Sequence, residues 1–417
     1  MYLLPVTERT PIPYEEALAR IVAHVPPPKP VEVPLAEAAG RVFLDTLVAD
    51  FSLPPFRRAG ADGFALRSRD VEKASPDRPV RLRIVAELAA GRTYDAPLGA
   101  GEAVRLMTGT AFPEGADTLL RLEDGEVEGD TLVVRRPLPP GRDVFEAGED
   151  IRQGEVLLRP GDFLTPGAIS VLATFGRTRV RVGRRPRIGI LVTGDELLAP
   201  DEPLVLGKIR ESNSFMLGAQ VAMLGMGAHV YGVVPDEREL LYARVRSALE
   251  EVDVLITTGG VAVGDYDLIP ETFRRVGGEI LFDRLAFRPG QLTTVAHVDG
   301  RMLFGLSGNP GAAFVGFYIF VRPYVLAYMG LSPERALHPR VPAVLEEAIP
   351  GRRRLPVYAR GCYRWEGGRI VARTLGPDSS SYLSTLVRAN ALLYLPAGED
   401  LPAGTEVETV LLDVAPH

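Results

Sequence analysis

Three short stretches of the sequence combine glycine with hydroxyl and acidic residues, and each follows an apolar run. They are residues 193–196 (TGDE), 258–267 (TGGVAVGDYD) and 307–311 (SGNPG). Glycine lets backbone N–H groups approach an anion closely, and a helix that begins after Asn309 would direct free N–H groups toward the same ligand. These residue types predict phosphate binding.

Carboxylates accompany two of the three loops. Asp195 and Glu196 lie in the first, and Asp265 and Asp267 lie in the second. Mg²⁺ is usually held by one or two carboxylates together with substrate phosphates, so these acids are candidate metal ligands. A single loop of this kind is most simply a tight turn, and only three such loops at one place would indicate a ligand site.

The surrounding elements decide whether the loops meet. Apolar runs alternate with helical patterns between residues 186 and 331, which predicts a parallel or mostly parallel α/β sheet. The expected strands are 187–193, 229–234, 253–258, 279–287 and 301–306, and the expected helices are 212–225, 236–252, 267–276 and 309–329. The carboxyl ends of parallel strands share one sheet edge, which is where ligands bind.

The rest of the chain reads differently. Helical spacing predicts a helix at 14–25 and a short one at 35–46, while 50–138 is rich in strand and turn patterns. Thr165 is a plausible N-cap for a further helix that starts at Pro166. The tail, 332–417, has short strand patterns and no convincing helix, so we expect a small β-barrel there.

Composition limits the class of protein. A chain of 417 residues with 46% apolar and 24% charged residues needs several domains and is globular. Its net charge of −7 gives no general reason to bind nucleic acid or an anionic membrane. The six arginines in 177–187 and the run 352–354 are solvated surface or, alternatively, a patch that attracts a phosphorylated substrate.

Other signals point to the cytoplasm. One cysteine, Cys362, cannot form an intrachain disulfide, and we see neither a signal peptide nor an uninterrupted membrane span. The best apolar stretch, 312–329, is broken by Arg322 and Pro323. Five scattered histidines argue against a zinc enzyme, and the sequence has neither a P-loop nor a GxSxG motif.

Taken together, eight phrases resemble one family, the molybdopterin molybdenumtransferases (MoeA/gephyrin). The phrases are ADGFA, RLMTGTAFPEGADTLLRLED, GEDIRQGEVLL, ILVTGDEL, GKIRESNSFMLGAQVAMLG, DVLITTGGVAVGDYD, FRPGQ and FGLSGNPGAAFVGF, in this order. TGDE, GGVxVGDxD and GxxGNP together are specific for this family. Any one of them alone would also fit relatives that share only the α/β domain.

The resemblance implies a multidomain fold. It consists of a discontinuous helical domain (1–49 and 141–180), an inserted β-rich domain (50–140), an α/β molybdopterin-binding domain (181–331) and a C-terminal β-barrel (332–417). The family's members are elongated homodimers with the site shared between subunits. The implied reaction inserts molybdate into adenylylated molybdopterin, with release of AMP in a Mg²⁺-dependent step.

The resemblance also assigns roles to residues. The expected catalytic residues are Asp62, Thr108, Asp150, Glu196 and Asp267. The expected ligands of Mg²⁺ are Glu196, Asp265 and Asp267. The residues expected to bind the pterin substrate are Thr193, Gly194, Asp195, Ser212, Asn213, Gly259, Gly260, Gly264, Arg288, Gly290, Ser307, Gly308, Asn309 and Pro310.

The sequence departs from the family pattern mainly in two segments, and also at Glu211, Ala262 and Ser307, which keeps other functions open. Residues 56–65 read FRRAGADGFA instead of FDxSAMDGYA, and 288–292 read RPGQL in place of a lysine-bearing KPGKP. A guanidinium does not replace an ammonium neutrally. The alternatives are a diverged paralogue that binds molybdopterin, its adenylate or a tungstate-type substrate without normal turnover, and a molybdopterin adenylyltransferase.

Overall fold

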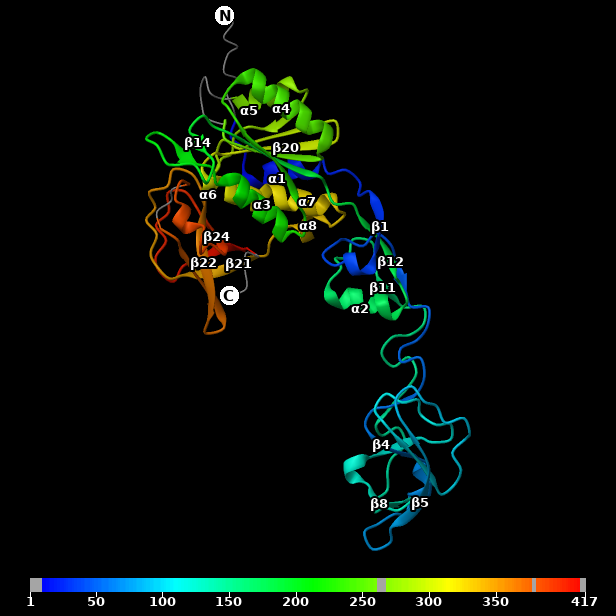
Figure 1. Cartoon of the computed structure of the whole chain (residues 1–417). Coiled ribbons are helices and arrows are strands. Elements are labelled where there is room, and N and C mark those ends of the chain that lie inside the picture. The colour runs from blue at the N-terminus through cyan, green and yellow to red at the C-terminus, as the bar shows by residue number, and fades with distance from the viewer. Residues whose placement is uncertain (1–9, 261–267, 377–379, 413–417) are drawn as a thin grey trace, which may run out of the picture. The chain divides into compact units, whose positions relative to one another are not determined.

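The chain folds into two compact units. The structure, a computed structural model, describes residues 10–260, 268–376 and 380–412. Unit 1 comprises Met1–Leu44, Pro160–Ile169 and Arg179–His417, and unit 2 comprises Asp45–Arg159 and Ser170–Thr178 (Figure 1). We describe each unit by itself.

A six-stranded, mostly parallel sheet forms the centre of unit 1. Its order is β16 (Ala228–Val234), β13 (Ile188–Thr193), β17 (Val254–Thr258), β20 (Arg301–Leu306), β19 (Thr294–Val298) and β18 (Glu279–Phe282). The first four strands are parallel, β19 runs antiparallel to β20, and β18 runs antiparallel to β19 and so parallel to the first four. Every residue of β13 and β17 is buried, as expected for parallel strands covered on both faces. The mostly parallel sheet predicted from the sequence is therefore confirmed.

The register brings the three strand ends to one level. Val192 of β13 pairs with Thr258 of β17, and Thr258 pairs with Leu306 of β20. The loops that follow these three strands therefore start at the same sheet edge, as the sequence predicted.

Helices cover both faces of this sheet (Figure 1). One buried cluster joins the sheet to α4 (Arg238–Glu251) and α5 (Leu268–Arg275). The other joins it to α1 (Tyr14–Val22), α3 (Asn213–Met223), α6 (Pro310–Gly316) and α7 (Arg322–Tyr328). A π-helical segment, Phe317–Val321, connects α6 to α7, so the long predicted helix is continuous.

The helix Pro310–Tyr328 has the length and apolar composition to cross a membrane. However, 94% of its most apolar window is buried within the protein. Burial on this scale is typical of a core helix, and here its aromatic residues pack on the sheet: Phe304 lies edge-on to Tyr324, with ring centroids 5.8 Å apart.

One predicted helix, 35–46, is wrong. Only the 3₁₀ turn Leu35–Glu37 forms, after strand β1 (Pro30–Pro34). Gly40 has a φ of 73°, a left-handed conformation that ends a helix, and its N–H bonds the Leu164 carbonyl. The following backbone forms isolated bridges instead, between Val42 and Phe163 and between Phe43 and Val182.

The helix predicted after Thr165 is confirmed as α2 (Pro166–Thr174). The Thr165 hydroxyl accepts a hydrogen bond from the Ala168 N–H at 3.3 Å, as an N-cap should. β1 pairs with β12 (Arg179–Gly183), the strand that follows α2 in the chain.

The tail forms the predicted closed barrel. Its order is β21 (Arg340–Leu345), β23 (Arg369–Thr374), β22 (Val357–Glu366), β24 (Ala391–Leu395) and β25 (Glu406–Leu411). A short helix, α8 (Pro333–Ala336), precedes it, so the prediction of a tail without a helix is wrong at this point. Ser332 caps α8 by accepting from the Arg335 N–H.

Unit 2 is built on a second six-stranded sheet. Its order is β7 (Thr118–Arg121), β4 (Gly63–Leu66), β6 (Glu102–Leu106), β5 (Val80–Leu88), β9 (Thr131–Val134) and β8 (Glu126–Glu128). Two short pairs accompany it: β2 (Leu47–Val48) with β11 (Val156–Leu158), and β3 (Arg58–Ala59) with β10 (Val144–Phe145).

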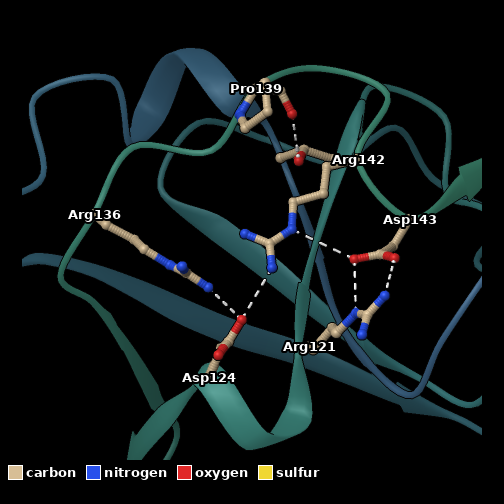
Figure 2. Close-up of polar contacts among 7 residues, drawn as sticks. Arg121, Asp124, Arg136, Pro139, Arg142 and Asp143 are labelled. Atoms are coloured by element: carbon tan, nitrogen blue, oxygen red, sulfur yellow. Dashed lines mark hydrogen bonds and ion pairs between the residues drawn. The ribbon is translucent and has the colours of Figure 1, made fainter.

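An ion-pair network in unit 2 holds the segment that precedes β4 (Figure 2). Arg121 binds Asp143 with two nitrogens, at 2.7 and 3.0 Å, and Arg142 contacts both Asp143 and Asp124. Asp143 has a φ of 54°, and its carbonyl accepts from the Gly60 N–H at 2.8 Å. The network therefore fixes the backbone just before Asp62.

Candidate functional site

The described residues of the three loops predicted to bind phosphate line one large cavity in unit 1, of about 1150 Å³. The predicted site residues that line it are Thr193, Gly194, Glu196, Ser212, Asn213, Gly259, Gly260, Arg288, Gly290, Ser307, Gly308, Asn309 and Pro310. Gly264, Asp265 and Asp267 lie outside the described residues. The cavity thus gathers residues from all of the predicted pterin-binding segments.

Asn213 holds two of the loops together. It is the first residue of α3, is 7% exposed, and its Nδ2 donates to Thr258 Oγ1 and to the Gly308 carbonyl, both at 2.8 Å. Thr258 Oγ1 in turn donates to the Ser307 carbonyl at 3.0 Å. Two buried side chains therefore set the spacing between the loops after β17 and β20.

The buried oxygen of Asn213 has capacity left. Asn213 Oδ1 has no hydrogen-bond partner among the described residues. A buried polar atom without a partner costs free energy.

Glycine is required where the loops approach each other. A Cβ on Gly259, whose φ is 97°, would lie 2.1 Å from the Thr193 carbonyl oxygen. A Cβ on Gly194 would lie 2.7 Å from Glu196 Oε2. The missing side chains therefore let β13 and β17 end close together and leave the Glu196 carboxylate room at the cavity wall.

The cavity wall includes two basic side chains that no sequence motif predicted. Lys208 and Arg210 line it beside the predicted Arg288. Arg210 belongs to β15 (Ile209–Arg210), which pairs with β14 (Leu197–Leu198) just after Glu196. The segment GKIRESN contains both residues, but only this pairing brings them to the first loop.

Three acids have structural partners. Asp195 is not among the residues that line the cavity, and its carboxylate accepts from the Asp236 N–H at 3.1 Å. Asp236, which does line the cavity, contacts the Thr193 hydroxyl. Glu211, also on the wall, caps α3 by accepting from Ser214 N and Oγ at 2.7 and 2.6 Å.

The barrel contributes a further part of the wall. Ser380, Ser381 and Leu383 line the cavity, and the Ser380 carbonyl accepts from the Gly311 N–H at 2.8 Å. Ser381 Oγ contacts Asn309 Oδ1 at 3.4 Å. No sequence motif marks these residues, since serine in a loop is common.

Unit 2 contains a separate pair of predicted catalytic residues. Thr108 donates to Asp62 Oδ1 from its backbone N–H at 2.7 Å and from its hydroxyl at 2.6 Å. These hydrogen bonds, first that from the hydroxyl, lower the pKa of the Asp62 carboxyl, and the positive charge of Arg105 acts in the same direction. Asp62 is therefore an oriented carboxylate that stays ionised.

Asp150 also lies in unit 2. Its side chain is exposed, and its backbone N–H bonds the Leu53 carbonyl at 3.0 Å. Asp62 lines a small pocket of about 20 Å³ with Glu87, Arg105 and Met107 among its neighbours, and Asp150 is not one of the residues of that pocket.

Known proteins resemble this chain along its length. The MoeA N-terminal region (domain I and II) matches residues 12–176, the probable molybdopterin binding domain matches 189–327, and the MoeA C-terminal region (domain IV) matches 342–412. The molybdopterin molybdenumtransferase of Bacillus subtilis (strain 168) is 38% identical over 97% of this chain and 95% of its own. That of Staphylococcus aureus (strain COL) is 35% identical over 98% and 97%.

A solved structure agrees. The molybdopterin biosynthesis moeA protein of Pyrococcus horikoshii OT3 superimposes with a TM-score of 0.80 at 31% identity, over 96% of this chain and 100% of that one. Matches to both ends and to the middle, in the same order, confirm the multidomain fold that the motifs implied. The chain belongs to the molybdopterin molybdenumtransferase (MoeA) family.

Proposed function

We propose that this protein inserts molybdate into adenylylated molybdopterin and releases AMP, a step of molybdenum cofactor biosynthesis. The observation that carries the proposal is the cavity at the end of β13, β17 and β20, with glycine loops, cations and the start of α6 on one wall. Such a wall suits a ligand with several phosphate oxygens.

Several residues of the cavity wall would bind the phosphates of the substrate. The backbone of the loop at Gly308, with the side chains of Lys208 and Arg288, would bind the phosphates.

Glu196 fits a role as a Mg²⁺ ligand. It is a hard oxygen donor on the cavity wall, and Gly194 leaves its carboxylate free space. We propose that Glu196 holds Mg²⁺ with Asp265 and Asp267. Bound Mg²⁺ would offset the negative charge of the phosphates.

We assign Asp62 and Thr108 to the molybdate or dithiolene end of the substrate, and we propose Asp150 as a third catalytic residue of unit 2.

The family resemblance implies a homodimer whose site is shared between subunits. Sedimentation equilibrium of the full chain should give twice the chain mass of 45.2 kDa, and a monomer at micromolar concentration would contradict the dimer.

The test is AMP release from adenylylated molybdopterin, with molybdate and Mg²⁺ supplied or withheld. Release should need both, and Asp62→Ala should slow it by about 100-fold or more, because an oriented ionised carboxylate is lost. Asp95→Ala is the matched control, since Asp95 is also exposed in unit 2 and also accepts from a threonine, Thr93, at 2.9 Å.

Other outcomes separate the alternatives. Tight binding of the adenylate without AMP release would favour a binding paralogue. Formation of the adenylate from ATP and molybdopterin would favour an adenylyltransferase. A wild-type rate that Asp62→Ala leaves unchanged would remove Asp62 from the mechanism.

A further inference from the structure

Three potential metal ligands meet at the far end of the sheet in unit 1, away from the cavity. His24 follows α1, Glu279 begins the edge strand β18, and His297 lies in β19 directly opposite Glu279 in the strand pairing. One ligand atom from each of the three lies within 4.8 Å of the others. None of the three belongs to the cavity wall.

The hydrogen bonding of His24 defines its tautomer. His24 Nδ1 lies 2.8 Å from the Arg20 carbonyl oxygen, which can only accept, so Nδ1 carries the proton. The lone pair of the neutral ring is then on Nε2, and Nε2 lies 3.9 Å from Glu279 Oε2. Nε2 of His24 and Oε2 of Glu279 are therefore the two atoms that a metal ion placed between them would contact.

His297 completes the set. Its ring centroid lies 4.9 Å from that of His24, with the ring planes 46° apart. Burial is the largest cause that lowers the pKa of His297. The charge of Glu279 and that of Asp299 oppose this shift.

The cations and acids near the cluster leave its centre open. Arg20 is the closest described cation along α1, and its guanidinium is engaged by the Leu281 carbonyl at 2.6 Å and by Glu16. The Glu279 side chain is 73% exposed, so its carboxylate can rotate at little cost.

We propose that His24, Glu279 and His297 bind a divalent transition-metal ion, with Zn²⁺ the best-fitting ion. Two imidazoles and one carboxylate, with a fourth position open to water, are a known zinc donor set, whereas Mg²⁺ and Ca²⁺ prefer oxygen ligands alone. Ligands of a tetrahedral zinc ion are about 3.4 Å apart, and rotation of the exposed Glu279 side chain would bring its carboxylate closer to the 3.9 Å distant His24 Nε2.

The Arg20 carbonyl supports this assignment. Histidine ligands generally donate their second ring N–H to a carbonyl or carboxylate, which fixes the ring and its tautomer, and His24 already does so. An ion held there would tie the end of α1 to the β18–β19 edge. The proposal is independent of the transferase reaction.

The experiment is a Zn²⁺ titration of the chelator-treated full-length protein against a competing chromophoric indicator, with millimolar Mg²⁺ present to occupy oxygen-rich sites. The wild type should bind one Zn²⁺ more than the double variant His24→Asn/His297→Asn. Each single variant, His24→Asn, His297→Asn or Glu279→Gln, should weaken that site about 10-fold or more. His229→Asn is the control, because His229 is exposed in β16 beside Tyr231 and outside the cluster.

A second measurement distinguishes the loss of a metal ligand from the unfolding of a variant. Co²⁺ added to the wild type should give the visible absorption of a four-coordinate site, and Glu279→Gln, which alters only an exposed side chain, should lose it. Zn²⁺ should raise the thermal midpoint of the wild type and of His229→Asn, but not that of the double variant. Equal stoichiometry in wild type and double variant, or no site tighter than about 1 mM, would overturn the proposal.

Discussion

At the scale of residues, the Asp62–Thr108 pair shows how an exposed carboxylate is oriented. Both donors come from one residue and bind one oxygen, Oδ1. The second carboxylate oxygen is therefore available to a ligand, and the hydrogen bonds hold the group ionised by lowering its pKa.

Removing the Thr108 hydroxyl tests this. Thr108→Ala should raise the pKa of the Asp62 carboxyl toward its ordinary value, because the largest cause of the lowered pKa is lost. Thr108→Ser should keep the lowered pKa, because it keeps the hydroxyl. Carboxyl-detected NMR titration measures both, and an unchanged pKa in Thr108→Ala would show that the hydroxyl does not bind Asp62 in solution.

Two arginines that depart from the family pattern make contacts with aromatic rings within unit 2. Arg57 lies over the Phe112 ring at 5.4 Å and pairs with Glu146, and Arg58 lies over the Phe145 ring at 5.2 Å. Cation–π contacts of this kind are locally stabilising. The altered segment before Asp62 is thus packed against its own unit, which is compatible with an intact Asp62 position.

At the scale of elements, the site depends on the short distance between the carboxyl ends of β13 and β17. Gly259 permits this approach, since any side chain there would meet the Thr193 carbonyl. The contact joins the first and second phosphate-binding loops, so the glycine serves the geometry of the cavity as well as its own turn.

Gly259→Ala should therefore destabilise unit 1 by roughly 2–4 kcal/mol, because it adds a backbone clash to the strain of a left-handed residue. Gly232→Ala is the matched control: Gly232 lies in β16 with a φ of 83°, and its Cβ would meet nothing within 4 Å. That variant should cost only about 1–2 kcal/mol. Thermal or denaturant unfolding of both variants measures the difference, and equal costs would refute the close approach.

At the scale of the whole molecule, one carboxylate connects three elements of unit 1. Asp253, just before β17, receives two hydrogen bonds from Arg184, at 2.8 and 2.9 Å, and one from the Arg187 N–H at 2.7 Å. Arg184 follows β12 and also contacts Tyr328 at the end of α7. Burial alone would raise the pKa of Asp253, but the hydrogen bonds from Arg184 and Arg187 outweigh it and lower the pKa to about 2.

A lowered pKa in the folded state gives stability that is present above the unfolded value of 3.8 and is lost as the pH falls through about 2. Asp253 should contribute about 2 kcal/mol in this way at pH 5 and little at pH 2. The gap in unfolding free energy between wild type and Asp253→Asn should therefore shrink as the pH falls from 4 to 2. A gap that stays constant over that range would contradict the ion pair.

Much of this protein could be predicted because its signals are local. The strand and helix alternation of 186–331, the cap at Thr165 and the barrel strands follow from side-chain spacing over short segments. The segment 35–46 was misread because helical spacing there competes with a left-handed Gly40 and with backbone bonds to residues far along the chain. Glycine and tertiary pairing prevail over a weak periodicity.

The sequence by itself determined which loops carry glycine, hydroxyl and acidic groups, the order of the strands that precede them, and, through its motifs, the family. Only the tertiary structure decided that Lys208, Arg210 and Ser381 join the cavity wall, that Asp195 bonds a neighbouring turn, and that two scattered histidines meet Glu279. The physical reason is that local spacing specifies elements, whereas strand register and packing bring together side chains hundreds of residues apart.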